Sequence, residues 1–524
     1  MAVMPRRDVS SGIDWRHARL VLLVAALLPL AVTVLLRQDR VPLGCPGRFV
    51  YLYSPVAAYR LAAVPAAVLL AAVLAAGTWL AGAAAASRRR WGLALVAVGA
   101  VALAFWAYVA PPYYRTQHIF NAESPAQDGA FVREALHVTS VREYLHDFPR
   151  RAQAPPAAMR GTRVISNPPG LTLVAVGVER LVRQFPVLHE LALGPLVNEL
   201  PPTESARALQ YANAVGLVFF WVLTALWVLA AGVLYWLARL YLPPVTAVAY
   251  ALCCVFAPAT LLLTPGKDPA QLLTVAVPLY LWLRAVRRDR VTPAVLAGLV
   301  LPVVCLASLV HVWLAAIVLV ATWFGAARRR RFLMRQVAPA AAAAVLAVLG
   351  LHLLCDVDLI AIARSVARAQ AEVTRGPSAM PLAWQLLGVP LFLLFVGPAW
   401  WTTTAWAALP QLGLRGPALA LGARKEPADR DTRLGRWLLI ATAAVMLATI
   451  GFTNLETPRL WIPFTPLLLL GALLQLTALR RPDRRVVWLL AMLVAVQVVA
   501  SALQWSQMDM REAETRLAEQ RFFG

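Results

Sequence analysis

The residues best placed for chemistry are carboxylates and cations that stand beside long apolar segments. Lys267 and Asp268 follow a Pro-Gly turn, and Glu456 and Arg459 lie one helical turn apart. Lys267 is one of only two lysines in a chain that otherwise uses arginine. Such a lysine indicates a point charge that binds a phosphate, although a tight turn with solvated charges explains it about equally well. Glu456 and Arg459 are compatible with an ion pair that fixes a loop.

A third acidic candidate, Asp128, begins an amphipathic stretch of the chain. Phe131, Ala135 and Val138 recur in it at helical spacing, which predicts a helix lying on a membrane surface. An N-cap is a common role for aspartate at such a position, and spacing alone favours that interpretation of Asp128. A second surface helix is predicted over about 140–148 by the same kind of pattern.

Asn167-Pro168-Pro169-Gly170 predicts the start of another short helix, over about 171–183. This segment is short and ends in charged residues, so we expect it to lie in the membrane interface rather than to cross. A rigid loop exit is the alternative interpretation of the two prolines.

Metal-ligand patterns are sparse. Asp356 and Asp358 form a pair that is compatible with a divalent cation, although two carboxylates alone fit solvated loop charges better. The histidines show no zinc-binding spacing. His311, near a predicted hairpin tip, fits a satisfied polar group better than a metal ligand. No cofactor is therefore predicted beyond this one candidate cation.

The composition identifies the class of protein. Of 524 residues, 60% are hydrophobic and only 14% are charged, with a mean hydropathy of +0.66; soluble domains are about 25% charged. The formal net charge of +23 comes from short arginine clusters between apolar runs, which is typical of a multispanning membrane protein. Five cysteines without a CxxC pair form no disulfide framework. A soluble enzyme, a nucleic-acid partner and a secreted disulfide scaffold are all excluded.

The expected fold is an all-α polytopic membrane protein with about 13 transmembrane helices and amphipathic surface helices in a large first extracytoplasmic loop, 110–206. The positive-inside rule places the N-terminus and the arginine clusters at 88–90, 287–290 and 480–485 in the cytoplasm. Arg37 and Arg40, which follow the first span, are a local conflict. The predicted spans cover about 18–36, 60–86, 91–109, 208–238, 245–263, 269–286, a two-helix hairpin that ends at Arg328, 337–355, 382–412, 437–452, 460–479 and 486–504.

The order of these features resembles the integral-membrane C-type glycosyltransferases (GT-C), which include protein O-mannosyltransferases and the lipid A aminoarabinose transferase. The resemblance covers about residues 91–480, which would form the catalytic module. Residues 1–90 would add a cytoplasmic N-terminus and an extra N-terminal transmembrane hairpin. Residues 481–524 would add the last transmembrane helix and a short outer tail. Many relatives have His or Lys where this chain has Asn167, and Asp-Glu where Asp128 is followed by Gly129. The motifs that carry the resemblance are Asp128, Asn167-Pro168-Pro169-Gly170, Arg207, Lys267-Asp268, and Glu456 with Arg459.

The resemblance implies an enzyme of the cytoplasmic (inner) cell membrane that moves a sugar from a polyprenyl-phosphate donor to a hydroxyl of a lipid, glycan or protein. The active site would face the extracytoplasmic side, and membrane lipids rather than nucleic acid would surround it. Asp128 becomes the expected general base and Asp268 its catalytic partner. The expected donor- and phosphate-binding residues are Lys267, Arg459, Glu456 and Arg207, and the expected substrate-loop residues are Asn167, Pro168, Pro169 and His311.

Two alternatives come from other classes of protein. A lipid-linked sugar flippase or transporter needs polar residues at mid-membrane depth, and the predicted spans carry almost none. A lipid-linked oligosaccharide polymerase or ligase would use arginines and a histidine in a large late outer loop. Here the large loop comes early, and the late loop at 356–380 has arginines but no histidine.

Overall fold

The computed structural model describes most of the helical part of the chain. Two-residue strands and scattered single residues are also described between 23 and 61, as are residues 386 and 479. The continuous described segments are 63–83, 88–109, 128–152, 162–193, 204–264, 266–325, 329–375, 388–408, 429–450, 457–476 and 482–509.

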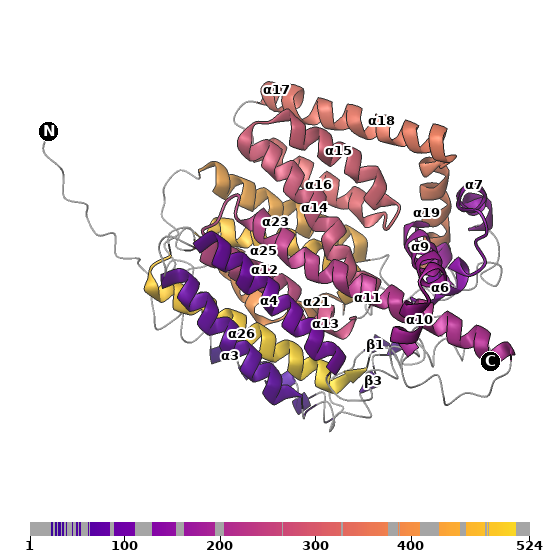
Figure 1. Cartoon of the computed structure of the whole chain (residues 1–524). Coiled ribbons are helices and arrows are strands. Elements are labelled where there is room, and N and C mark those ends of the chain that lie inside the picture. The colour runs from indigo at the N-terminus through magenta and orange to yellow at the C-terminus, as the bar shows by residue number, and fades with distance from the viewer. Residues whose placement is uncertain are drawn as a thin grey trace, which may run out of the picture.

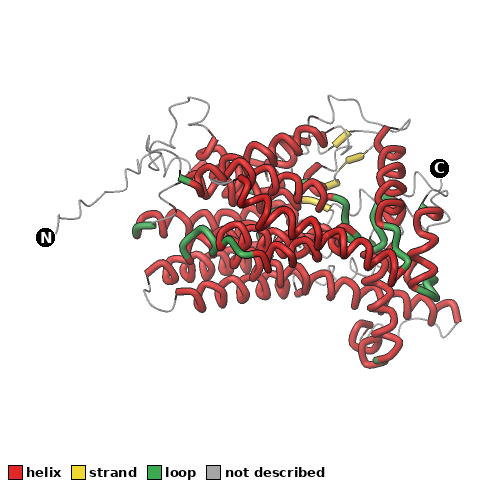
Figure 2. The backbone as a smooth tube through the Cα atoms, turned by 90° about the horizontal axis from the view of Figure 1, so that it is seen from above, coloured by secondary structure: helices red, strands yellow, loops and turns green. Residues whose placement is uncertain are grey.

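The described chain is built almost entirely of α-helices that run side by side in one bundle (Figures 1 and 2). Large apolar side chains from most of these helices form one continuous core. The bundle helices are α3 (Val64–Ala83), α4 (Arg88–Val109), α11 (Glu204–Ala238), α12 (Pro244–Val255), α13 (Pro258–Leu262), α14 (Lys267–Arg288), α15 (Val291–Cys305), α16 (Val310–Gly325), α17 (Arg329–Phe332), α18 (Ala338–Cys355), α21 (Gly388–Val396), α22 (Pro398–Ala408), α23 (Arg430–Thr449), α24 (Thr457–Leu460), α25 (Thr465–Gln475) and α26 (Arg484–Gln507).

Five helices within the described segments are long and apolar enough to cross a membrane: Val64–Gly82, Arg207–Ala238, Lys267–Arg288, Arg330–Cys355 and Arg484–Gln507. Further apolar helices of 10–17 residues accompany them in the bundle. These helices support the predicted α-helical membrane protein. They do not reach the predicted number of 13 spans.

Two predicted spans are interrupted rather than continuous. The segment predicted at 245–263 is divided into α12 and α13, and the segment predicted at 382–412 is divided at Gly397 into α21 and α22. Gly397 has φ +89°, a left-handed conformation that favours glycine. Gln497 of α26 binds both sides of this break, since its amide donates to the Val396 carbonyl and its oxygen accepts the Ala399 N–H. A polar side chain inside the bundle thus satisfies the backbone groups that the break exposes.

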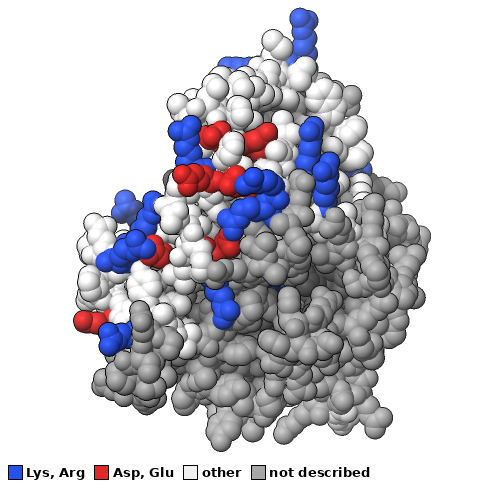
Figure 3. Space-filling model, turned by 90° about the vertical axis from the view of Figure 1, so that its right-hand side faces the viewer, with Lys and Arg blue, Asp and Glu red and all other residues white. Residues whose placement is uncertain are grey.

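A second group of helices, here called the loop cap, covers one end of the bundle (Figure 1). Charged side chains of both signs lie on its face in Figure 3. The loop cap consists of α6 (Gly129–Ala135), α7 (Val141–Arg151), α8 (Thr162–Ile165), α9 (Gly170–Gln184), α10 (Pro186–Leu193) and α19 (Leu359–Arg375).

The predicted surface helices are present, but one of them is not on a surface. α7 matches the prediction at 140–148 and is capped by the Ser140 hydroxyl, which accepts the Glu143 N–H. α9 matches the prediction at 171–183, and its 15 residues are fewer than the roughly 20 needed to cross a bilayer. α6 differs, because nearly all its residues are buried against α9 and α11. The amphipathic pattern identified one apolar face and could not show that other helices cover the rest.

The two ends of α14 define the two ends of the bundle. Its 22 residues span about 33 Å at 1.5 Å per residue, close to the thickness of a bilayer core. At the end called here the arginine-rich end, Arg287 pairs with Asp431 at 2.8 Å and Arg430 donates to the Val286 carbonyl. At the other end, α14 begins with Lys267 beneath the loop cap.

Two short ribbons complete the described fold. β1 (Gly44–Cys45) pairs with β2 (Phe49–Val50), and β3 (Leu52–Tyr53) pairs with β4 (Met508–Asp509), both antiparallel. The second ribbon joins the segment before α3 to the residues that directly follow α26. These two segments therefore lie at the same end of the bundle.

Candidate functional site

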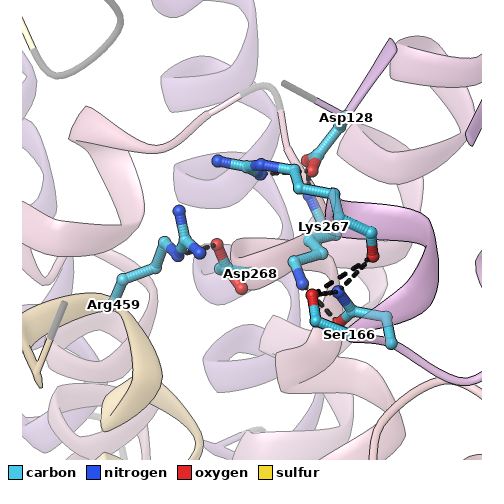
Figure 4. A network of polar contacts seen from close by, with 7 residues as sticks. Asp128, Ser166, Lys267, Asp268 and Arg459 are labelled. Carbon is cyan, nitrogen blue, oxygen red and sulfur yellow. Dashed lines mark hydrogen bonds and ion pairs between the residues drawn. The ribbon is translucent and has the colours of Figure 1, made fainter. Parts of the chain in front are cut away.

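Charged side chains from four separated segments meet where the loop cap covers the start of α14 (Figure 4). One oxygen of Asp128 accepts a hydrogen bond from Arg163 at 2.7 Å, and the other accepts the backbone N–H of Lys267 at 2.7 Å. The Lys267 ammonium donates to the Asn167 side-chain oxygen at 2.6 Å. Asp268 lies 3.4 Å from Arg459. We call these six residues the charge cluster.

Asp128 does not cap its own helix. Its side chain makes no hydrogen bond to the first turn of α6, so the N-cap role that spacing alone favoured is wrong. The carboxylate instead caps the start of α14, 139 residues further along the chain. A negative charge at a helix N-terminus interacts favourably with the helix dipole and satisfies a backbone donor that the helix leaves free.

A glycine allows this approach. A Cβ on Gly266 would lie 2.5 Å from the Leu263 carbonyl oxygen and 3.2 Å from an oxygen of Asp128. A side chain at this position would therefore collide with the turn before α14 and crowd the carboxylate. The glycine that precedes Lys267 thus has a steric function beside the charge cluster.

Lys267 and Asp268 are neighbours in sequence but point in different directions in Figure 4, one toward the turn at Ser166 and the other toward Arg459. Both are buried, and the Lys267 ammonium also lies 5.9 Å from the centre of the Phe131 ring. The side chains of Asp268 and Arg459 are each 9% exposed. Charges this well shielded from water act strongly on one another and on any ion that enters.

The charges around Asp128 keep it ionised. Although burial by itself raises the pKa of this carboxyl, the positive charges of Arg163 and Lys267 and the Lys267 N–H outweigh burial and hold the pKa below its ordinary value. Asp128 is therefore a carboxylate at neutral pH. A carboxylate has about four acceptor sites, so the two bonds that fix it leave capacity to accept a proton.

This lowered pKa predicts how stability depends on pH. Asp128 stabilises the fold above about pH 4, the ordinary pKa of the unfolded chain, and this contribution is lost as the pH falls through the lowered folded pKa. We expect Asp128→Asn to be less stable than wild type near pH 6, with a difference that shrinks as the pH falls below about 4. Thermal unfolding of both proteins in detergent, at several pH values from about 6 downward, measures this difference in stability. A difference that stays constant or grows in acid would contradict the prediction.

The structure brings together five of the residues predicted from the sequence: Asp128, Asn167, Lys267, Asp268 and Arg459. Pro168 and Pro169 lie beside them, buried at the start of α9. There the N–H of Gly170 donates to the Leu306 carbonyl at 2.7 Å, which joins the turn to the end of α15.

Three predicted residues are not shown in the charge cluster. His311 is buried and bonds to the Ser308 carbonyl and to Thr274, which lies two turns into α14 from Lys267. Arg207 is exposed at the start of α11. Glu456 lies outside the described residues.

Arg163 is the member of the charge cluster that sequence reasoning missed. Its side chain is 12% exposed and pairs with Asp128, while its carbonyl accepts the Asn167 amide at 2.7 Å. Arg163 therefore contacts both Asp128 and Asn167, the two residues to which Lys267 also bonds. Its position four residues before Asn167 was the only available signal, and it stands in a loop with many other arginines.

The two aspartates that were candidates for binding a divalent cation, Asp356 and Asp358, have other roles in the structure. Asp356 lies 3.3 Å from His146 and 3.7 Å from Arg142, both of α7. Asp358 caps α19 by accepting the N–H groups of Ile360 and Ala361. Within the described segments, no group of three or more His, Cys, Asp and Glu residues is arranged to hold a metal ion. The observed bonds of both aspartates are those of structural residues.

Comparison with known proteins adds no relative. No family model matches the chain, and no curated protein or solved structure matches it.

Proposed function

We propose that this protein is a membrane glycosyltransferase of the C type, which moves a sugar from a polyprenyl-phosphate donor to a hydroxyl of a lipid, glycan or protein. The observation that supports the proposal is the charge cluster, in which two carboxylates and two cations are buried, with Arg163 half-buried beside them, beneath the loop cap at one end of a membrane bundle. A lipid-linked sugar phosphate needs its headgroup site at that depth, because its chain lies in the bilayer.

The proposed reaction uses the two kinds of charge separately. The acceptor oxygen forms a bond to the anomeric carbon of the sugar, and its proton passes to the Asp128 carboxylate. The bond between that carbon and the phosphate oxygen breaks, and the electron pair stays on the polyprenyl phosphate. Lys267 and Arg459 stabilise the charge on this leaving group. Arg163 and the Lys267 N–H fix the orientation of Asp128.

An apolar cavity of about 200 Å³ offers a place for the donor chain. It lies among α14, α15, α16 and α18, and α14 contributes Val275 and Pro278, two to three turns beyond Lys267. His311 is the ionisable side chain at its wall. The cavity thus lies further along α14 from the charge cluster, toward the arginine-rich end, and we place the chain of a bound donor there.

Filling this cavity should discriminate between donors by chain length. Ala315 lines it, so Ala315→Trp is expected to raise KM for a full-length polyprenyl donor at least tenfold and to leave a short-chain donor nearly unchanged. Ala316→Trp is the matched control, since Ala316 is exposed on the same helix and does not line the cavity. Steady-state transfer with both donors measures the effect. Equal losses for long and short donors would exclude this cavity as the chain site.

We further propose the orientation predicted from the sequence, with about 13 spans, a cytoplasmic N-terminus and an extracytoplasmic charge cluster in the inner cell membrane. The clustering of arginines at the far end of α14 supports it, because arginines concentrate on the cytoplasmic side of membrane proteins. The ribbon between β3 and β4 supports it as well, because the proposed topology places the segment before α3 and the residues after α26 on the same, outer side.

Cysteine labelling tests this orientation. In a background without native thiols, single cysteines are placed at one accessible site near each end of the bundle. The Asp147 side chain of the loop cap is 42% exposed, and Arg330 is exposed on α17, where the adjacent Arg331 pairs with Asp289 just after α14. A membrane-impermeant maleimide should label Asp147→Cys in intact cells and Arg330→Cys only after permeabilisation. The reverse pattern would place the charge cluster in the cytoplasm and contradict the proposed donor leaflet.

The proposed activity is tested with purified protein in liposomes that contain radiolabelled polyprenyl-phosphate sugars. A glycosyltransferase forms a new glycosidic bond and releases polyprenyl phosphate. A flippase moves the donor between leaflets and leaves it intact, and a polymerase or ligase acts on lipid-linked oligosaccharides but not on a single lipid-linked sugar. Transfer from a single-sugar donor is the result that we expect.

A further inference from the structure

A second apolar hollow lies outside the charge cluster, on the helices that precede and follow the GT-C-like region. α3 and α26 pack side by side (Figure 1), and between them runs an apolar groove of about 490 Å³. Its walls carry small side chains, and Trp79 and Trp488 stand at one end. The small wall residues are Ala71, Ala72, Ala75 and Ala76 of α3 and Ala491 and Ala495 of α26.

The groove has the length of a single lipid leaflet. It extends along α3 from Val68 to Trp79, which is about 16 Å at 1.5 Å per residue, or roughly half of a bilayer core of about 30 Å. Just beyond the tryptophans the two helices meet closely, because a Cβ on Gly82 would lie 2.5 Å from a methyl group of Val487. This contact closes the groove at the end where a headgroup would sit.

Positive charge is concentrated at that same end. The Arg484 guanidinium lies 5.8 Å from the centre of the Trp79 ring, and Arg484 stands one helical turn before Trp488 on α26. Arg90, exposed on the neighbouring helix α4, belongs to the arginine run that follows α3. Tryptophans mark the interfacial level of a membrane, and basic residues beside helix grooves at the cytoplasmic side bind anionic headgroups.

We propose that this groove binds one acyl chain of an anionic phospholipid and that Arg484 binds the phosphate. The chain lies against the alanines, the tryptophans flank the glycerol region, and the headgroup faces the arginine-rich end. Charge complementarity selects an anionic lipid over a zwitterionic one. The site does not depend on the proposed sugar transfer, since it uses no residue of the charge cluster.

The test is native mass spectrometry of the full-length protein after exchange into equal amounts of phosphatidylglycerol and phosphatidylethanolamine. Wild-type protein should retain one molecule of phosphatidylglycerol in preference to phosphatidylethanolamine. Arg484→Gln should lower that preference about fivefold while a lipid chain is still retained. Arg330→Gln, which removes an exposed arginine of the same end outside the groove, should leave the preference unchanged.

Variants that fill the groove test the chain site itself. Ala75→Phe should abolish retention of the lipid, whereas Leu69→Phe should not, because Leu69 is 67% exposed on α3 and does not line the groove. Ala495→Phe fills the groove from the other wall if Ala75→Phe fails to fold. Equal retention of the two lipids by wild type, no retained lipid in wild type, or full retention in a filled variant would each overturn the proposal.

Discussion

Asp128→Asn is expected to reduce the rate of sugar transfer by about 10²–10⁴-fold, the usual cost of losing a general base. The substitution keeps the size of the side chain and removes its charge. It also breaks a buried ion pair with Arg163, which typically costs about 3–5 kcal/mol of stability. Turnover at saturating donor should therefore be measured on folded protein, at a temperature below the unfolding transition of the variant.

Two further variants separate catalysis from folding. Asp147→Asn removes a partly exposed carboxylate of the same loop cap and should leave the rate unchanged. Asp128→Glu retains the charge and should restore most of the stability but only part of the rate, because its carboxylate is displaced by one methylene. If folded Asp128→Asn keeps near-normal turnover, Asp128 only joins the loop cap to α14, and Asp268 becomes the candidate base.

Lys267→Met has the second largest expected effect. It removes the ammonium, while the backbone N–H that binds Asp128 remains. Loss of one charged donor to a developing anion typically costs about 10²–10³-fold in kcat. Because we propose that the same ammonium binds the phosphate of the donor, KM for the donor should also rise. Asp128→Asn should instead lower kcat with little change in this KM.

The chain provides a matched control for the lysine. Lys425 is the only other lysine, lies between the predicted spans 382–412 and 437–452 and is not among the candidate site residues, so Lys425→Met should change neither constant. Lys267→Arg keeps a positive charge and should recover part of the donor affinity. Initial rates over a range of donor concentrations measure both constants. Unchanged KM and kcat in Lys267→Met would contradict the proposal that Lys267 binds the donor.

Much of the charge cluster could be predicted from the sequence, because ionisable residues at the edges of apolar segments are costly unless they have partners. Lys267 and Asp268 stood out for that reason, and Asp128 stood out because it begins an amphipathic stretch; the structure brings all three together. The specific partners could not be predicted. Asp128 contacts an N–H that is 139 residues away, and no local pattern encodes a contact at that separation.

The errors have similar physical causes. Hydropathy finds apolar segments but does not show a break inside one, such as the break at Gly397 that Gln497 of another helix stabilises. Helical periodicity located α6 but could not show that other elements bury its polar side as well. Arg163 was missed because a buried arginine and a solvated one look alike in an arginine-rich loop.

The most direct test of the central claim is a product analysis with purified protein and a panel of radiolabelled polyprenyl-phosphate sugars. One donor of the panel should be consumed in the presence of an acceptor hydroxyl. Transferred sugar and released polyprenyl phosphate should then appear in equal amounts, and both should be lost in folded Asp128→Asn. Folded wild-type protein that cleaves no donor of the panel, or a variant that transfers as fast as wild type, would contradict the account.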